Sequence, residues 1–477
     1  VELIEVCTSH ELSCHNILAA VTFAARQNSL NKKKTKKKKA KKKKTGAKPR
    51  APAQNILLLL LETIYSVQEN VRAVRFASDA FCVLCQQASG DGMLPFMLEI
   101  GSSGLNAVAV AASVLTHTHT LATSSSSATA DGSQAMAHCR ESLSRLLAAL
   151  SVYPQWRAFF CAFDAIPALI GVLRPNTVDS VAARANALAA LMNSAVASDD
   201  TASEVYTEIR DQIHRGGAVA WLVHLCGGAL GKDKTQARNK STTKGKEGGA
   251  GVSASTASTS TTTTVAQEAA LRRQRRLNKS MSDHVRERAA GLLSRCAVHP
   301  PILETLSHPS LYSRVAVAFV SAWQDSLRAD TDDLPLLANL VRIVASCTSA
   351  TRPQTLNLMR DSGADLAMVA LLRYVALDLK LKPSDPRHRP SVQIAGNACK
   401  CMIACVANPT SAQANMLVRK GKLIGTVIDV IRSTNEASTR KNAAITLARL
   451  AKDPGHMVQI RELRGMEILM SLGRTIV

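Results

Sequence analysis

Two groups of cysteines are the first residues in this 477-residue chain whose types and spacing suggest chemistry. Cys82 and Cys85 lie in the run FCVLC, and Cys399, Cys401 and Cys405 lie in CKCMIAC. Both runs are apolar with helical periodicity, and neither has a second CxxC pair or two histidines at the spacing of a zinc site. We therefore expect these thiols to be buried and to pack as small apolar side chains, without a metal ion or a cofactor.

The histidines of the run THTHT are the next candidate ligands. His117 and His119 would share one side of an extended segment, but the Ser/Thr-rich stretch around them offers no further ligand. We expect both rings to be solvated. The sequence also lacks a phosphate-binding glycine loop, a nucleophile elbow and a pair of carboxylates in a catalytic motif, so we predict that the chain is not an enzyme.

Most of the positive charge lies in two segments. Residues 31–50 contain 12 Lys and one Arg without an acid, and residues 231–282 contain 11 basic and three acidic residues. These segments carry +13 and +8 of the net charge of +23, so the rest of the chain is close to neutral. Their composition predicts disordered insertions.

The basic insertions could bind nucleic acid, an anionic surface or acidic protein tails, or act as a nuclear localisation signal. The side chains that would do so are Lys32, Lys36, Lys41, Lys44, Arg272, Arg273, Arg275 and Arg276. The lysine run has no interleaved aromatic residues of the kind that stack on single-stranded bases. Low-complexity expansion in a tolerant loop explains it equally well.

The composition limits the fold and the compartment. Hydrophobic residues make up 46% of the chain but aromatics only 3%, which favours close-packed helices over strands. Twelve cysteines without a disulfide-framework spacing indicate a reducing compartment, so we expect the cytoplasm or the nucleus. The longest aliphatic run, residues 56–61, is far shorter than the roughly 20 residues of a membrane span. We expect no signal peptide in this sequence. Because the chain begins with Val1 rather than Met and enters almost at once into a predicted helix, we expect it to be a piece of a longer protein.

A repeated helix triplet organises the chain. Near the C-terminus, LVRKGKLIGTVIDVI and RKNAAITLARLAKD predict a short first helix, a corner at Gly421, a second helix and a long third helix. We expect Gly421 to form the corner because glycine readily adopts the left-handed conformation. The same pattern recurs as DAIPALIGVL with ARANALAALMNSA, and as SGADLAMVALL with GNACKCMIACVAN.

Insertions interrupt the triplets between the second and third helices. Gly421 and Leu447 are 26 positions apart, whereas the corresponding Gly217 and Leu293 are 76 apart. The additional separation of about 50 positions matches the length of residues 231–282, which we therefore interpret as a loop within one repeat. The same comparison predicts loops at 117–134 and 376–390. The predicted organisation is a partial repeat at 1–30, an insertion at 31–50, repeats at 51–230, the insertion at 231–282 and repeats at 283–477.

These triplets resemble the armadillo-repeat superfamily over most of the chain outside the insertions. The resemblance implies an all-α fold, an armadillo-like α-solenoid in which three-helix repeats form a right-handed superhelix. More narrowly, RKNAAITLARLAKDPGHMVQIRELRGMEIL resembles the C-terminal half of co-chaperones that join tetratricopeptide repeats to an armadillo tail, of the myosin chaperone and axonemal dynein assembly types. Their tetratricopeptide half is absent from this sequence. This narrower resemblance implies a cytoplasmic assembly factor for motor proteins.

The armadillo resemblance also implies a binding groove along the third helices, where peptide-binding members carry the motif L-x-N. This chain has the motif once, at Asn193, and the equivalent positions of other repeats hold Arg295, Arg342, Cys405 and Arg449. Arginines in a groove favour acidic or C-terminal carboxylate ligands through charge-assisted hydrogen bonds. The alternative is that they solvate the helix edge or pair with neighbouring acids.

We therefore predict a protein-binding scaffold or co-chaperone whose groove holds an acidic or extended client segment. Chaperones and motor subunits are expected partners, and membranes are not. The second hypothesis is a nucleic-acid-binding or nuclear-transport adaptor that acts through the basic insertions. We expect Arg295→Glu with Arg449→Glu to weaken client binding without unfolding the chain, because both arginines should be exposed on the groove edge. We expect Leu447→Ala to destabilise the chain by roughly 2 to 5 kcal/mol.

Overall fold

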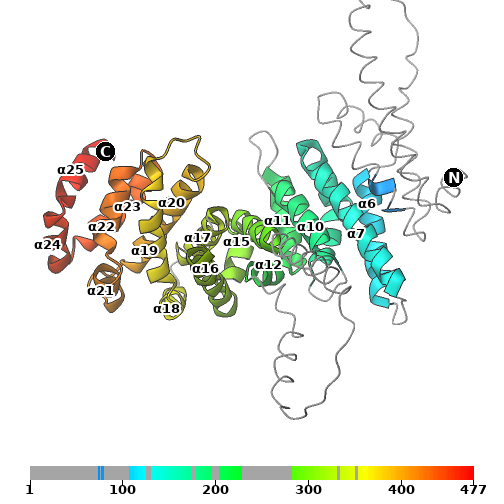
Figure 1. Ribbon diagram of the computed structural model, residues 1–477, viewed down its shortest axis with the longest axis horizontal. Coiled ribbons are helices and arrows are strands. Elements are labelled where there is room, and N and C mark those ends of the chain that lie inside the picture. The colour runs from blue at the N-terminus through cyan, green and yellow to red at the C-terminus, as the bar shows by residue number, and fades with distance from the viewer. Residues whose placement is uncertain are drawn as a thin grey trace, which may run out of the picture. The chain divides into compact units, whose positions relative to one another are not determined.

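The computed structural model describes residues 74–75, 77–79, 107–124, 130–174, 179–195, 203–227, 282–329, 333–349 and 353–476. Every regular element within these ranges is a helix, so the prediction of an all-α chain is confirmed (Figure 1). The chain divides into two compact units, Val1–Ala218 (unit 1) and Val219–Val477 (unit 2). The predicted elements at 1–30 and 31–50, the residues Cys82 and Cys85, and the arginines at 272–276 lie outside the described residues.

Unit 1 is built from pairs and triplets of helices. Its described elements are α6 (Ala107–Ser124), α7 (Ala130–Ser151), the 3-10 turn η1 (Pro154–Trp156), α8 (Arg157–Ala162), α9 (Ala165–Leu173), α10 (Val181–Ser194) and α11 (Ser203–Arg215), and its last residue opens α12 (Ala218–Cys226). The short helix α9 is buried along nearly its whole length because α6, α8, α10 and α11 all pack against it. The third helices α7 and α10 pack directly on each other.

Unit 2 repeats the triplet more regularly. After α12 and a helix over 282–296, its elements are α15 (Pro300–Ser307), α16 (Pro309–Ala329), α17 (Leu334–Ser349), α18 (Pro353–Asp361), α19 (Ala364–Val375), the 3-10 turn η3 (Asp378–Lys380), α20 (His388–Cys405), α21 (Ala412–Arg419), α22 (Leu423–Ser433), α23 (Ala437–Leu450), α24 (Pro454–Glu462) and α25 (Gly465–Ile476). Second helices pack on second helices in the series α16, α19 and α22, and third helices on third helices in the series α17, α20 and α23 (Figure 1).

The corner between first and second helices recurs with one backbone signature. The positive φ angles among the described residues fall at Asp164, Gly217, Gly363, Lys422 and Arg464, each immediately before a second helix. At the corner predicted for Gly421 the left-handed residue is Lys422, with φ of 58°, so that assignment was one residue early. Gly421 is needed for a different reason, because a Cβ there would lie 2.5 Å from the carbonyl oxygen of Leu417.

Hydrogen bonds fix the register of neighbouring third helices. From α23 to α20, Asn442 donates to the carbonyl of Gly396 (3.3 Å), Thr446 to that of Cys399 (3.2 Å), and Arg449 to that of Ile403 (2.7 Å). The nearly constant sequence offset means that the two helices run parallel. Leu447 lies between these contacts with a fully buried side chain, as its spacing predicts.

The predicted insertions have different outcomes. The loop expected at 117–134 is wrong, because α6 continues to Ser124 and α7 starts at Ala130. The loop expected at 376–390 falls between α19 and α20, and α20 takes only its last three residues. Residues 231–281 lie outside the described ranges. The helix that follows them returns to the helix before them, since Arg286 Nε donates to the Cys226 carbonyl at 2.7 Å.

No helix among the described residues combines the length and the apolar character needed to cross a membrane.

Candidate protein-binding surface

The third helices α17, α20 and α23 of unit 2 form a layer that carries charge of only one sign. They contain six Arg and Lys residues and no Asp or Glu. The three helices lie side by side, α17 against α20 and α20 against α23 (Figure 1). We call this the basic layer. A surface that gathers cations without interspersed acids produces a positive potential that attracts anionic ligands.

Exposure shows which cations the layer presents to solvent. Arg342 on α17, Arg389 and Lys400 on α20, and Lys441 on α23 are all exposed. On α20, Arg389, Gln393 and Lys400 lie on one helix face, because separations of four and eleven residues return to the same side of an α-helix. The exposed face of α20 is therefore polar and basic, and the apolar side chains at the intervening positions point into the core.

The structure separates the three predicted groove arginines into different environments. Arg342 is exposed on α17, as expected for a ligand-binding position, and Arg295 is half-buried near the end of the helix over 282–296. Arg449 is half-buried, and its Nη1 donates to the Ile403 carbonyl on α20 at 2.7 Å. The expectation that Arg295 and Arg449 are both exposed on the groove edge is therefore wrong, since both are half-buried and the Arg449 guanidinium joins two third helices.

Asn193 lies in unit 1, whereas the three arginines lie in unit 2. It is half-buried on α10, and its Nδ2 donates to Ser151 Oγ at the end of α7 at 3.2 Å. This amide links two third helices in the way that Arg449 does.

Arg389, Lys400 and Lys441 are surface cations that the motif-based prediction missed. The L-x-N comparison examines one position per third helix, and these residues lie earlier in their helices. A count of charges over each whole helix would have found them, because α17, α20 and α23 each lack an acid.

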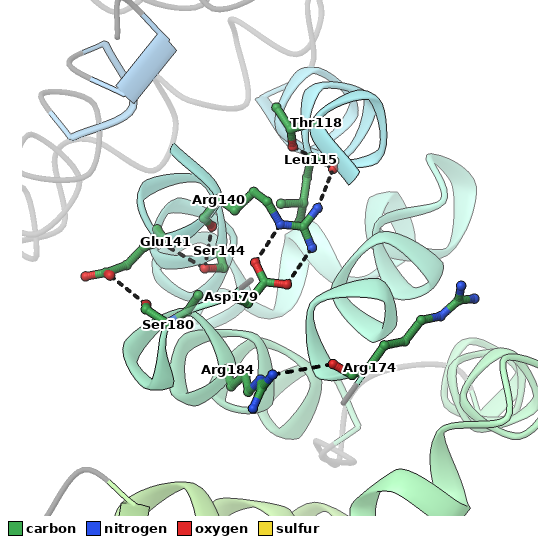
Figure 2. A network of polar contacts seen from close by, with 10 residues as sticks. Leu115, Thr118, Arg140, Glu141, Ser144, Arg174, Asp179, Ser180 and Arg184 are labelled. Carbon is green, nitrogen blue, oxygen red and sulfur yellow. Dashed lines mark hydrogen bonds and ion pairs between the residues drawn. The ribbon is translucent and has the colours of Figure 1, made fainter. Parts of the chain in front are cut away.

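In unit 1, charged side chains at the third helices are buried in an ion pair. Figure 2 shows the Arg140 guanidinium between Asp179 and the Leu115 carbonyl of α6. Nε and Nη2 of Arg140 donate to the two carboxylate oxygens of Asp179 at 2.5 and 2.8 Å, and both side chains are almost fully excluded from solvent. Nearby, Ser180 Oγ donates to the Glu141 carboxylate, and Arg184 reaches the Arg174 carbonyl. These contacts join the start of α10 to α7.

His117 and His119 both lie in the helix α6 and are half-buried, so the expectation of two solvated histidines in a loop is wrong, and His119 lies beside this network. Burial is the main cause of the lowered pKa of His119, followed by the charges of Arg140 and Arg174, while Asp179 opposes the shift. The neutral imidazole is therefore favoured in the folded chain.

The cysteine run on α20 is part of the core. Cys399 and Cys401 are fully buried and Cys405 nearly so, as predicted, and burial raises the pKa of Cys399 to about 12. Cys401 and Cys405 contact the thioether of Met359 on α18 at 3.6 and 3.9 Å. Over the part of the chain that the structure describes, no three His, Cys, Asp or Glu side chains are grouped so that they could hold a metal ion. The thiols therefore act as packing groups.

No protein-family model matches the sequence, and no curated protein shows significant sequence similarity to it.

Proposed function

We propose that the chain is a non-enzymatic protein-binding scaffold, an armadillo-like α-solenoid whose basic layer holds an acidic segment of a partner protein. The observation that carries the proposal is the combination of six cations and no acids on α17, α20 and α23. The recurring left-handed corner and the series of packed second and third helices support the solenoid part of the proposal.

An extended acidic segment suits this layer for a geometric reason. Parallel third helices lie about 10 Å apart, so cations on neighbouring helices are spaced at roughly three residues of an extended chain. Arg342 and Arg389 offer guanidinium groups that bind carboxylates in a bidentate manner, and Lys400 and Lys441 supply further point charges on α20 and α23. A partner with acidic side chains every few residues would neutralise the layer.

Motor subunits and chaperones are the partners to test first, because residues 440–469 resemble the armadillo tail of motor-assembly co-chaperones. The eight described cysteines are all free thiols, which supports a cytoplasmic or nuclear location in which the chain acts as an assembly factor.

Affinity purification from native cell extract with mass spectrometry tests the proposal. It would compare the intact chain, a chain without residues 31–50 and 231–282, and the layer variant Arg342→Gln/Arg389→Gln/Lys400→Gln/Lys441→Gln. We expect a defined set of proteins to survive the deletion and to be lost from the layer variant. Proteins retained by the layer variant would refute the proposal.

The second candidate function is binding of nucleic acid through the basic insertions, which carry +13 and +8. Such binding weakens steeply as the salt concentration rises, because bound phosphates release counterions. Recovery of nucleoproteins that disappear when residues 31–50 and 231–282 are deleted would favour this function.

A further inference from the structure

Three consecutive corners of unit 2 carry an exposed arginine at the same position. Arg360, Arg419 and Arg461 each lie three residues before the left-handed corner residue, and all three are exposed. Because α19 packs on α22, and α22 packs on α24, the three corners follow one another along the unit (Figure 1). We call the corner segments RDSG (360–363), RKGK (419–422) and RELR (461–464) the corner edge.

Two of the corner residues are cations in a backbone conformation that favours glycine. Lys422 and Arg464 have φ angles of 58° and 57°, whereas two other corners use Gly217 and Gly363. A Cβ at either glycine would meet no atom of the described chain within 4 Å, so a side chain at this place projects into open space. Lys422 and Arg464 are both exposed. Packing within the chain therefore does not offset the free-energy cost of the left-handed conformation at these two cations.

A second pair of arginines is held beside these cations by hydrogen bonds. Arg373 Nη2 donates to the Gly421 carbonyl at 2.9 Å, and Arg432 Nη2 donates to the Leu463 carbonyl at 3.1 Å. Each arginine lies ten residues after its own corner and reaches the residue directly before the left-handed residue of the next corner. Both side chains remain exposed, and a guanidinium has five N–H donors, of which this contact uses one. The same arrangement is thus repeated at two neighbouring corners.

The corner edge has more cations than acids. Together with Arg373 and Arg432 it has eight cations. The exposed acids within one turn of these cations are Asp361, Asp429, Glu462 and Glu467. Neighbouring repeats lie about 10 Å apart, so the edge is roughly 20 Å long. Duplex nucleic acid carries about one negative charge per 1.7 Å of its axis, so a duplex along the edge would bring roughly a dozen charges to it.

We propose that the corner edge binds the phosphate backbone of duplex nucleic acid without reading its sequence. Protein interfaces are centred on apolar and aromatic side chains, and helices at a membrane surface insert an apolar face. The corner segments contain one large apolar side chain, Leu463. Proteins that bind single strands stack the bases on aromatic side chains, whereas residues 375–477 contain no Phe, Tyr or Trp. This site is distinct from the basic insertions, and it does not depend on the basic layer.

Fluorescence anisotropy with a labelled DNA duplex tests the corner edge in the full chain. The edge variant is Arg419→Gln/Lys422→Gln/Arg461→Gln/Arg464→Gln, and its charge-matched control is the layer variant. Both variants retain the basic insertions, whose contribution is therefore common to them. At physiological salt the edge variant should bind roughly tenfold more weakly than the unmodified chain, and the slope of log affinity against log salt should become shallower by about 3. The layer variant should lose about threefold or less.

Glycine at the two left-handed corners separates binding from stability. Lys422→Gly/Arg464→Gly should weaken duplex binding by about threefold or more, because two phosphate contacts are lost. The same variant should not lower the melting temperature, since glycine adopts a positive φ without steric cost. A lower melting temperature with unchanged duplex binding would show that the two cations serve the fold, and would overturn the proposal.

Two further probes decide between ligands. The labelled probes are a glutamate-rich peptide and vesicles of equimolar phosphatidylcholine and phosphatidylserine, and each should bind the edge variant and the unmodified chain within about twofold. A loss for either probe as large as the loss for the duplex would overturn the assignment to nucleic acid. Equal duplex affinity and equal salt slopes in the edge variant and the unmodified chain would overturn the site itself. The acidic-segment proposal is tested separately, by the layer variant with the peptide.

Discussion

The two units use the same helix triplet but differ in the charged side chains that they bury. Among the described residues, the buried arginines are Arg140, Arg157 and Arg184, and all three lie in unit 1. Unit 2 buries aspartates instead, with Asp365 fully excluded from solvent and Asp378 nearly so. Unit 1 thus buries three arginines and one aspartate, Asp179, whereas the described part of unit 2 buries two aspartates and keeps its arginines and lysines half-buried or exposed.

This difference shows that the same helix triplet can accommodate different buried charges. A buried charge needs a partner, and each unit supplies one locally: Asp179 for Arg140 in unit 1, and Gln413 with the backbone for Asp365 in unit 2. The charges that remain at the surface contribute most to the external potential.

The largest expected effect comes from breaking the buried pair of unit 1. Asp179→Asn leaves the Arg140 guanidinium buried without a counter-charge, and we expect unit 1 to lose about 3 to 5 kcal/mol of unfolding free energy. Hydrogen exchange of unit 1 peptides would measure the loss. The double variant Arg140→Met/Asp179→Leu should recover most of it, and a loss in the double variant as large as in Asp179→Asn would contradict this account.

The two units should lose similar amounts of unfolding free energy when a core leucine is truncated. Leu191 in α10 and Leu447 in α23 are both fully buried at the same place in their triplets. Truncation of either to alanine should cost roughly 2 to 5 kcal/mol, measured as faster hydrogen exchange in its own unit. A loss below about 1 kcal/mol at only one of the two sites would show that the triplets do not share one core.

The arginines of unit 2 should divide into structural and surface residues. Arg449→Gln removes a hydrogen bond to the Ile403 carbonyl, and we expect a loss of about 1 to 3 kcal/mol. Arg342→Gln, at an exposed position, should change stability by less than about 0.5 kcal/mol. Thermal unfolding of the two variants in parallel tests whether Arg449 is structural and Arg342 is not. Equal melting temperatures would contradict this distinction.

The smallest expected effect is a pH dependence confined to unit 1. Because the pKa of His119 is lowered from 6.5 on folding, the unfolded chain binds more protons just below that pH. The stability of unit 1 should therefore fall as the pH decreases through 6.5 toward the lowered value. His119→Gln should remove this part of the dependence in urea denaturation followed by hydrogen exchange, whereas His308→Gln, at an exposed position, should not.

The sequence predicted the parts of the fold that depend on local pattern. Helical spacing located the second and third helices around Leu447, and the apolar run of α20 indicated buried cysteines. The prediction of a loop at 117–134 was wrong because it relied on the weak helix propensity of threonine and serine. In α6, Thr116 and Thr120 donate to carbonyls of the preceding turn, and Val114, Leu115 and Thr118 are buried. The packing of these buried side chains therefore outweighs the weak helix propensity of threonine and serine in α6.

Contacts between distant residues could not be predicted from one sequence. Arg140 and Asp179 are 39 positions apart, and nothing in their local sequence distinguishes a buried pair from surface charges. Arg449 likewise matches a groove position in the motif, and only the parallel register of α20 and α23 directs its guanidinium to Ile403. The acid-free character of α17, α20 and α23 was visible in the sequence, but their side-by-side placement was not.

The most direct test of the basic layer is the affinity of the full chain for a labelled glutamate-rich peptide at physiological salt. Arg342→Gln/Arg389→Gln/Lys400→Gln/Lys441→Gln would be compared with the charge-matched control Arg314→Gln/Arg328→Gln/Arg419→Gln/Lys420→Gln, whose residues are exposed on first and second helices or at a helix end. Both variants retain the lysine run, so its contribution cancels. We predict at least a roughly tenfold loss of affinity in the layer variant and a change of about twofold or less in the control. Equal losses in the two variants would contradict the assignment of α17, α20 and α23 as the binding surface.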